Sequence, residues 1–142
     1  MTSEPVVLPE TTLLDVEDAK EELRSVLRSH RRSRHRHRKN GHDPVCGSLT
    51  EHALEALDGA RTVTAYVSVG CEPCTRPLLN RREKRGVTVL LPVLGPRLSR
   101  SWGVFHGADD LAERAPGRPP EPGGAALPAE AVARADALVI PA

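Results

Sequence analysis

Apolar residues recur at helical spacing near the start of the chain. The first stripe follows steps of three and four residues and consists of Val16, Ala19, Leu23, Val26 and Leu27. This spacing predicts an amphipathic helix that begins near Thr12 or Asp15, either of which can cap it. Residues 1–11 are polar and carry two prolines, which predicts a disordered tail.

A basic run follows this stripe. Residues 28–39 contain six arginines, one lysine and three histidines. The formal net charge of the whole chain is only +1, so no global field attracts nucleic acid. We therefore favour a solvated helix and expect no nucleic-acid partner, while a basic nucleic-acid-binding module stays a functional alternative.

The residue pattern in the middle of the chain predicts four elements in the order helix, strand, helix and strand. Ser48 and Glu51 form a capping-box pattern that opens the earlier helix, and Gly59 stops it. Residues 61–69 are rich in Val and Thr, which is typical of a strand. Residues 87–93 are continuously apolar, as in strands that are buried on both faces of a parallel sheet.

Between these two segments, Thr75 can cap a helix that has Pro77 in its first turn and Gly86 at its end. Strand, helix and strand then form a βαβ unit, whose two strands run parallel.

The last third of the chain predicts shorter elements. They are extended pieces in 97–105, a small helix in 109–115, a loop over the five prolines and three glycines of 116–128, a helix in 128–135 and a buried strand in 136–141. The predicted fold class is α/β, with a three-layer, mostly parallel sheet and helices on both faces. Because nothing follows the last apolar strand to cover it, we expect the fold to be incomplete at the C-terminus.

Composition narrows the class of protein. The 142 residues suit one domain, and only 2% of them are aromatic, so the core must be aliphatic. No apolar run approaches the length of a membrane span, and we expect no membrane partner. Three cysteines, an odd number without a secretory signal, indicate a reducing compartment and a cytoplasmic location.

The Cys71 and Cys74 pair has the spacing Cys-x-x-Cys and supports two chemical interpretations. In the first, the pair joins His42 and Cys46 in a zinc site, which needs four ligands. In the second, the pair is a redox centre, because it lies between a strand and the start of a helix, as the cysteines of thioredoxin-like sites do. Gly70 argues against the second, because thioredoxin-like sites usually have an aromatic residue there.

A third interpretation makes the cysteines incidental and assigns the turn to Glu72 and Thr75. A carboxylate in the turn after a parallel strand is well placed to accept hydrogen bonds from a bound ligand. Thr75 then caps the following helix, and the plain alternative for Glu72 is an ordinary acidic loop residue.

Four segments in the same order resemble the 5-formyltetrahydrofolate cyclo-ligase family. "AYVSVGCEPCTRPLLNRREKRGVTVLLPVL" is similar to its strand, Glu-x-x-Thr turn, helix and strand, with Glu72 and Thr75 in the matching places. "AKEELR", which holds Lys20 and Arg24, is similar to the family's opening Lys-x-x-x-Arg. "RPPEP", which includes Glu121, resembles the family's "IPEP" loop, and "DALVIPA" resembles its "DLVLVPG" strand.

The resemblance implies an ATP-dependent cyclisation of 5-formyltetrahydrofolate to 5,10-methenyltetrahydrofolate that uses Mg²⁺. Lys20 and Arg24 would bind ATP, since residues four apart lie on one helix face and both cations can reach the same phosphates. Val67 and Glu72 would bind the reduced folate, while catalytic residues and metal ligands stay unassigned, as does a role for Glu121. The resemblance also implies a monomer whose partners are the reduced folate and ATP.

One departure from the family concerns its glycine-rich phosphate loop, Gly-x-Gly-Gly-x-Tyr-Asp-Arg, which the sequence does not contain. We therefore expect residues 12–142 to be the N-terminal part of a single folate cyclo-ligase-like α/β domain that does not turn over by itself.

Overall fold

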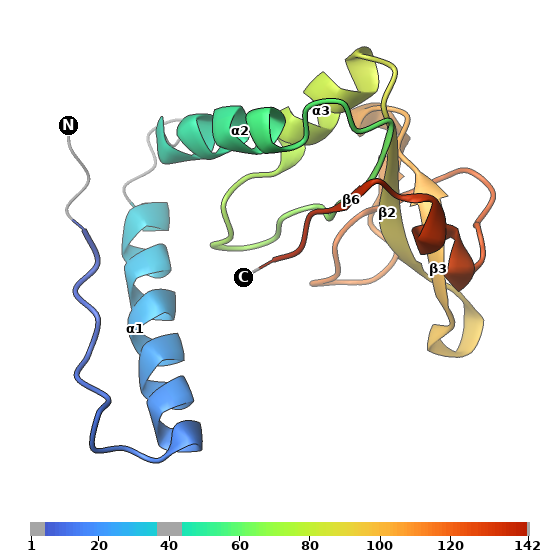
Figure 1. Cartoon of the computed structure of the whole chain (residues 1–142). Helices are drawn as coiled ribbons and strands as arrows, with labels where there is room; N and C mark the ends of the chain where they lie inside the picture. The colour runs from blue at the N-terminus through green and yellow to red at the C-terminus, as the bar shows by residue number, and fades with distance from the viewer. Residues whose placement is uncertain (1–4, 37–43, 142) are drawn as a thin grey trace. The chain divides into compact units, whose positions relative to one another are not determined.

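The computed structural model describes residues 5–36 and 44–141 (Figure 1). The chain divides into two compact units, residues 1–43 and residues 44–142, and each is described by itself below. No helix in the described part of the chain is long and apolar enough to cross a membrane.

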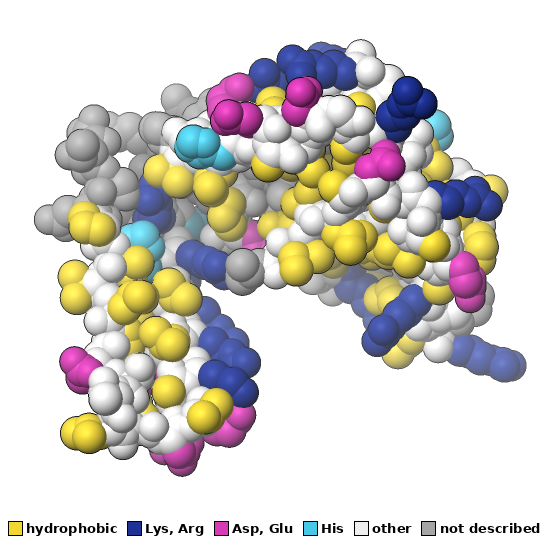
Figure 2. Space-filling model, viewed as in Figure 1, with side chains coloured by type: hydrophobic (Ala, Val, Ile, Leu, Met, Phe, Trp, Pro, Cys, Tyr) yellow, Lys and Arg dark blue, Asp and Glu magenta, His cyan; other side chains and the backbone are white. Residues whose placement is uncertain are grey.

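The first unit contains one long helix, α1 (Val16–Arg36). Asp15 caps it, because its Oδ1 accepts hydrogen bonds from the backbone N–H groups of Glu17 at 2.9 Å and Asp18 at 3.0 Å. Every residue of α1 is at least partly exposed. Figure 2 shows hydrophobic side chains on one side of this helix and basic ones on another. The predicted start at Asp15 is therefore confirmed, and most of the basic run is helical.

The second unit is built on a four-stranded sheet with the order β3-β2-β1-β6. The strands are β1 (Thr62–Thr64), β2 (Thr88–Leu94), β3 (Arg100–Val104) and β6 (Ala137–Leu138). β1 pairs in parallel with both β2 and β6, whereas β2 and β3 are antiparallel. The α/β class is thus confirmed, with a mixed sheet in which two of the three strand pairs are parallel. Helices on both faces of the sheet stay a prediction.

The remaining elements connect these strands. They are α2 (Pro44–Ala56), α3 (Arg76–Lys84), the 3-10 helices η1 (Pro96–Leu98), η2 (Ala108–Asp110) and η3 (Ala129–Arg134), and the two-stranded sheet of β4 (Leu111–Ala112) and β5 (Glu121–Pro122). An isolated antiparallel bridge also joins Trp102 of β3 to Leu127.

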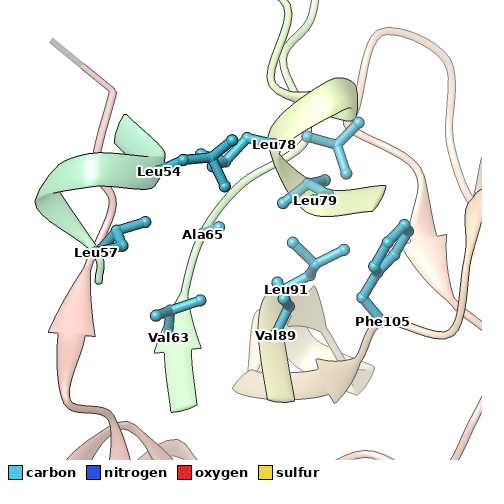
Figure 3. Packing of buried hydrophobic residues seen from close by; sticks show 10 residues of the cluster. Leu54, Leu57, Val63, Ala65, Leu78, Leu79, Val89, Leu91 and Phe105 are labelled. Carbon is cyan, nitrogen blue, oxygen red and sulfur yellow. The ribbon is translucent and has the colours of Figure 1, made fainter. Parts of the chain in front are cut away.

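The core lies between the sheet and the helices α2 and α3. Alternate residues of the β1 segment point to one face, where they meet side chains from both helices (Figure 3). The buried cluster consists of Leu54, Leu57, Val63, Ala65, Val67, Leu78, Leu79, Val89, Leu91 and Phe105. Each fully buried aliphatic side chain contributes about 1.5–3 kcal/mol, so this cluster fixes α3 and the turn that precedes it against the sheet.

The helix α3 forms where Pro77 and Gly86 predicted it. Pro77 lies in its first turn, and Gly86 follows its end with φ of +75°, a conformation that favours glycine. Arg82 of α3 is 4% exposed and donates from Nη2 to the carbonyl oxygen of Leu54 at 2.7 Å. This bond satisfies a carbonyl in the last turn of α2, which has no partner within its own helix.

Two predicted helices differ from the structure. The predicted start of the helix at Ser48 is wrong, because α2 already begins at Pro44. Proline is a residue type favoured at a first helical position. The predicted helix over 109–115 is also wrong. There Leu111 pairs with Pro122 and Ala112 pairs with Glu121, so strand pairing replaces the helix and reaches into the predicted loop.

Two predicted strands are shorter than expected. Regular β1 ends at Thr64, although the N–H of Ala65 still donates to the carbonyl of Leu90 at 2.9 Å. The predicted burial of the strand in 136–141 is wrong, because β6 lies at an edge of the sheet. There Leu138 is 60% exposed and Ile140 is 76% exposed.

Candidate functional site at the carboxyl edge of the sheet

The parallel strands β1, β2 and β6 end at the same edge of the sheet, which we call the carboxyl edge. In open α/β sheets ligands bind beyond this edge, where loops replace regular strand pairing. Two carboxylate-bearing segments lie here: the turn of residues 66–75, which follows β1, and Glu121, which contacts the last residue of β2.

The turn of residues 66–75 is held closed by a reciprocal pair of hydrogen bonds. The N–H of Ser68 donates to Oγ1 of Thr75 at 3.0 Å, and the N–H of Thr75 donates to Oγ of Ser68 at 3.0 Å. The Thr75 hydroxyl also donates to the carbonyl of Tyr66 at 2.7 Å. Thr75 is only 8% exposed, so these bonds replace water contacts that the turn would otherwise need.

The prediction that the Thr75 side chain caps α3 is therefore wrong. Thr75 does occupy the position before the helix, but its side chain makes no capping hydrogen bond there. Its hydroxyl points back to the strand segment instead, because Ser68 and Tyr66 offer a donor and an acceptor at short distance.

Glu72 lies at the tip of this turn and is half-buried. The N–H of Val69 donates to its Oε2 at 2.8 Å, and the N–H of Glu72 donates to the carbonyl of Val69 at 3.2 Å. Gly70 between them has φ of +56°, a conformation that glycine adopts without strain. The turn thus fixes one carboxylate oxygen, and a carboxylate can accept about four hydrogen bonds in total.

Val67 lies near the start of this turn, and its side chain belongs to the buried core rather than to the surface. It supports the segment that carries Glu72, and its contact with a ligand stays a prediction.

Glu121 provides the second carboxylate. It is buried, and its Oε1 accepts a hydrogen bond from the N–H of Leu94 at 3.0 Å, which holds β5 to the end of β2. An open, mostly apolar hollow of about 380 Å³ lies nearby and is lined by Pro92, Val93, Leu94, Arg100, Ser101, Trp102 and Ala129. The indole N–H of Trp102 donates to the carbonyl of Ala129 at 3.1 Å, which fixes the ring in this wall.

The three cysteines gather around the same turn. Cys46 of α2 is buried, and its Sγ accepts a hydrogen bond from the N–H of Cys74 at 3.3 Å. Within the described residues, Cys46, Cys71 and Cys74 form no disulfide. His42, the fourth ligand of the zinc interpretation, lies outside the described residues, and within those residues no three His, Cys, Asp or Glu side chains are grouped to hold a metal ion.

Asp136 lies at the opposite end of β1 and has a structural role that the sequence did not reveal. Its Oδ2 accepts hydrogen bonds from the N–H groups of Thr62 at 2.9 Å and Arg61 at 2.8 Å. The bonds from Thr62 and then Arg61 lower the pKa of this carboxyl below its ordinary value of 3.8, and the charge of Arg61 adds to the effect. Asp136 thereby aligns β6 with β1.

Lys20 and Arg24 belong to the first unit, on α1. Both are exposed, and Nζ of Lys20 lies 2.7 Å from Oε1 of Glu17. Since these cations and Glu72 belong to different units, a cleft shared between them stays a prediction.

Fold and turn together define a mixed α/β domain with a carboxylate-bearing loop at the carboxyl edge of its sheet, an arrangement typical of ligand-binding α/β proteins. The model of the 5-formyltetrahydrofolate cyclo-ligase family matches residues 16–142. The chain is also 36% identical over 138 residues to a 5-formyltetrahydrofolate cyclo-ligase of Mycolicibacterium smegmatis, and the match covers 87% of this chain. The chain belongs to the 5-formyltetrahydrofolate cyclo-ligase family. It spans 64% of the length of that relative.

Proposed function

We propose that this chain binds a reduced folate at its carboxyl edge, as part of the ATP-dependent conversion of 5-formyltetrahydrofolate to 5,10-methenyltetrahydrofolate. One observation carries the proposal: the turn of residues 66–75 holds the Glu72 carboxylate in a fixed place after a central parallel strand. Family membership supports the choice of ligand.

Glu72 is the residue that recognises the folate in this proposal. A reduced pterin presents several N–H donors in one plane, and an ionised carboxylate accepts such bonds more strongly than a neutral group does. The bond from the N–H of Val69 orients the carboxylate in advance, so less side-chain entropy is lost when the ligand binds. Val67 and the rest of the core keep this segment rigid.

The proposed reaction requires that the formyl oxygen become a better leaving group. Transfer of the γ-phosphoryl group of ATP to this oxygen breaks the bond to ADP, and attack by N10 on the formyl carbon then expels phosphate. Lys20 and Arg24 are the residues that we assign to the nucleotide phosphates, because two cations on successive turns of one helix can share them.

Magnesium belongs to the proposed reaction through the family only. The described residues offer no group of His, Cys, Asp and Glu side chains that fits a metal ion, so we derive no step through it. A cytoplasmic location and a monomeric state likewise stay predictions.

The test is a titration of the 142-residue chain with 5-formyltetrahydrofolate in a calorimeter, without ATP. Glu72→Gln keeps the size of the side chain but removes the charge, and should weaken binding about 10–100-fold, the loss expected for one charge-assisted hydrogen bond. The matched control is Glu113→Gln, an exposed carboxylate of the same unit, which should leave affinity unchanged. Equal affinities of the Glu72→Gln variant and the wild type would refute the proposed role of the turn.

A further inference from the structure

Five basic residues of α1 follow one another at intervals of four positions. They are Lys20, Arg24, Arg28, Arg32 and Arg36, and each of them is exposed. We call this set the basic ridge. Only the first two members match the family's opening motif, so the last three have no role in the proposed folate reaction.

The helix geometry makes the ridge continuous. Four residues advance an α-helix by about 6 Å and turn it by about 40°, so successive members are neighbours on its surface. From Arg28 to Arg36 the ridge covers about 12 Å of helix length within about 80° of its circumference. Figure 2 shows basic side chains gathered along one side of α1, in agreement with this geometry.

The charges of α1 are separated along its length. Its acidic residues all lie in the first seven positions and are Glu17, Asp18, Glu21 and Glu22. From Leu23 to Arg36 there are six arginines and no acidic residue. The ion pair of Arg28 with Glu21 is 3.8 Å long and exposed, so solvent and salt weaken it strongly. A net charge of +1 for the chain therefore hides a strongly positive local surface.

The spacing and chemistry of the ridge favour a linear phosphate polymer over other anions. Arginine matches phosphate oxygens with two parallel hydrogen bonds, and a row of arginines matches a row of phosphates. A membrane surface fits less well, because the apolar stripe of α1 is short, half-buried at Ala19, Leu23 and Val26, and contains no aromatic residue. One nucleotide bound at Lys20 and Arg24 leaves the last three arginines unused.

In contrast to the expectation from the net charge of the whole chain, we propose that the basic ridge of α1 binds the phosphodiester backbone of single-stranded nucleic acid, independently of base sequence. Arg28, Arg32 and Arg36 make the contacts that distinguish this activity from nucleotide binding. The interaction depends on salt, because each phosphate that an arginine neutralises releases bound counterions.

Fluorescence anisotropy of a labelled 20-nucleotide oligouridylate, titrated with the whole chain over a series of salt concentrations, tests this proposal. Replacing Arg28, Arg32 and Arg36 by glutamine should weaken binding at least about tenfold at low salt. It should also reduce the slope of log affinity against log salt by about 2, since each single-strand phosphate contributes about 0.7. Glutamine is a good helix former, and circular dichroism verifies that the helix persists.

Two further variants make the result specific. A charge-matched variant with glutamine at the exposed positions Arg76, Arg85 and Arg118 of the second unit should bind as the wild type does. A variant with lysine at the three ridge positions should keep the salt slope, because the charge remains. Equal losses in the ridge and charge-matched variants would overturn the proposal. So would binding to phosphatidylserine vesicles without binding to the oligouridylate, or no binding to either.

Discussion

Replacing Thr75 by valine removes one hydroxyl from a site where it makes two hydrogen bonds. Oγ1 accepts from the N–H of Ser68 at 3.0 Å and donates to the carbonyl of Tyr66 at 2.7 Å. Valine has nearly the same shape but can make neither bond, so both backbone groups lose these hydrogen bonds beside a residue that is only 8% exposed. A polar group left unsatisfied by such a change costs about 1–3 kcal/mol.

The expected loss for Thr75→Val is therefore about 2–6 kcal/mol, which is a large share of the 5–15 kcal/mol that is typical of a domain. For a unit of this size, about 2 kcal/mol lowers Tm by roughly 10 °C. Urea unfolding followed by the fluorescence of Trp102 measures the change, because this residue is the only tryptophan in the chain.

Thr75→Ser is the matched control for this experiment. It keeps the hydroxyl and loses only a methyl group, which costs about 1 kcal/mol or less. If valine and serine at this position lower the free energy of unfolding equally, the hydroxyl does not hold the turn and the account of its geometry is wrong.

Two other predictions concern residues away from the turn. Asp136→Asn should lower stability at neutral pH, because the carboxylate accepts two backbone hydrogen bonds that lower its pKa below 3.8. Since the folded-state pKa is the lower one, this stabilisation is complete above about pH 4 and is lost as pH falls through that pKa. Urea midpoints of both proteins should converge in acid, and a difference that does not vary with pH would contradict this reasoning. Arg82→Ala should cost about 2–4 kcal/mol in urea unfolding, since it removes a buried charged donor to Leu54. Arg81→Ala, which breaks only an exposed ion pair with Glu51, should cost less than about 1 kcal/mol, and equal costs would refute the role of Arg82.

Elements that depend on local signals could be predicted from the sequence. The helix α3 followed from Pro77 in its first turn and Gly86 after its end, and α1 followed from its apolar stripe and the cap at Asp15. These residues act within a few positions of where they stand, so no knowledge of the distant chain is needed.

Elements that depend on distant partners could not be predicted in this way. Residues 109–115 have a helical pattern, yet Leu111 pairs with Pro122 across an intervening loop, and this pairing determines the structure. The strand β6 is apolar but lies at a sheet edge, because its position is determined by pairing with β1 and by Asp136 rather than by its own sequence.

The candidate site was predictable in its residue types and not in its geometry. Glu72 followed from a motif in the turn after a strand. The hydrogen bonds of Ser68 with Thr75 could not be predicted, because two residues seven positions apart come into contact only for particular backbone paths of the turn. The contact of Cys46 with Cys74 could not be predicted either, because it joins segments 28 positions apart.

The central claim is that a reduced folate binds at the turn of residues 66–75. Amide chemical shifts of the isotope-labelled chain, recorded during a titration with 5-formyltetrahydrofolate, test it most directly. We expect the largest shift changes to fall on Val69, Glu72 and their neighbours in this turn and to saturate together. Saturable changes that leave residues 66–75 unaffected and cluster on another part of the chain would contradict it.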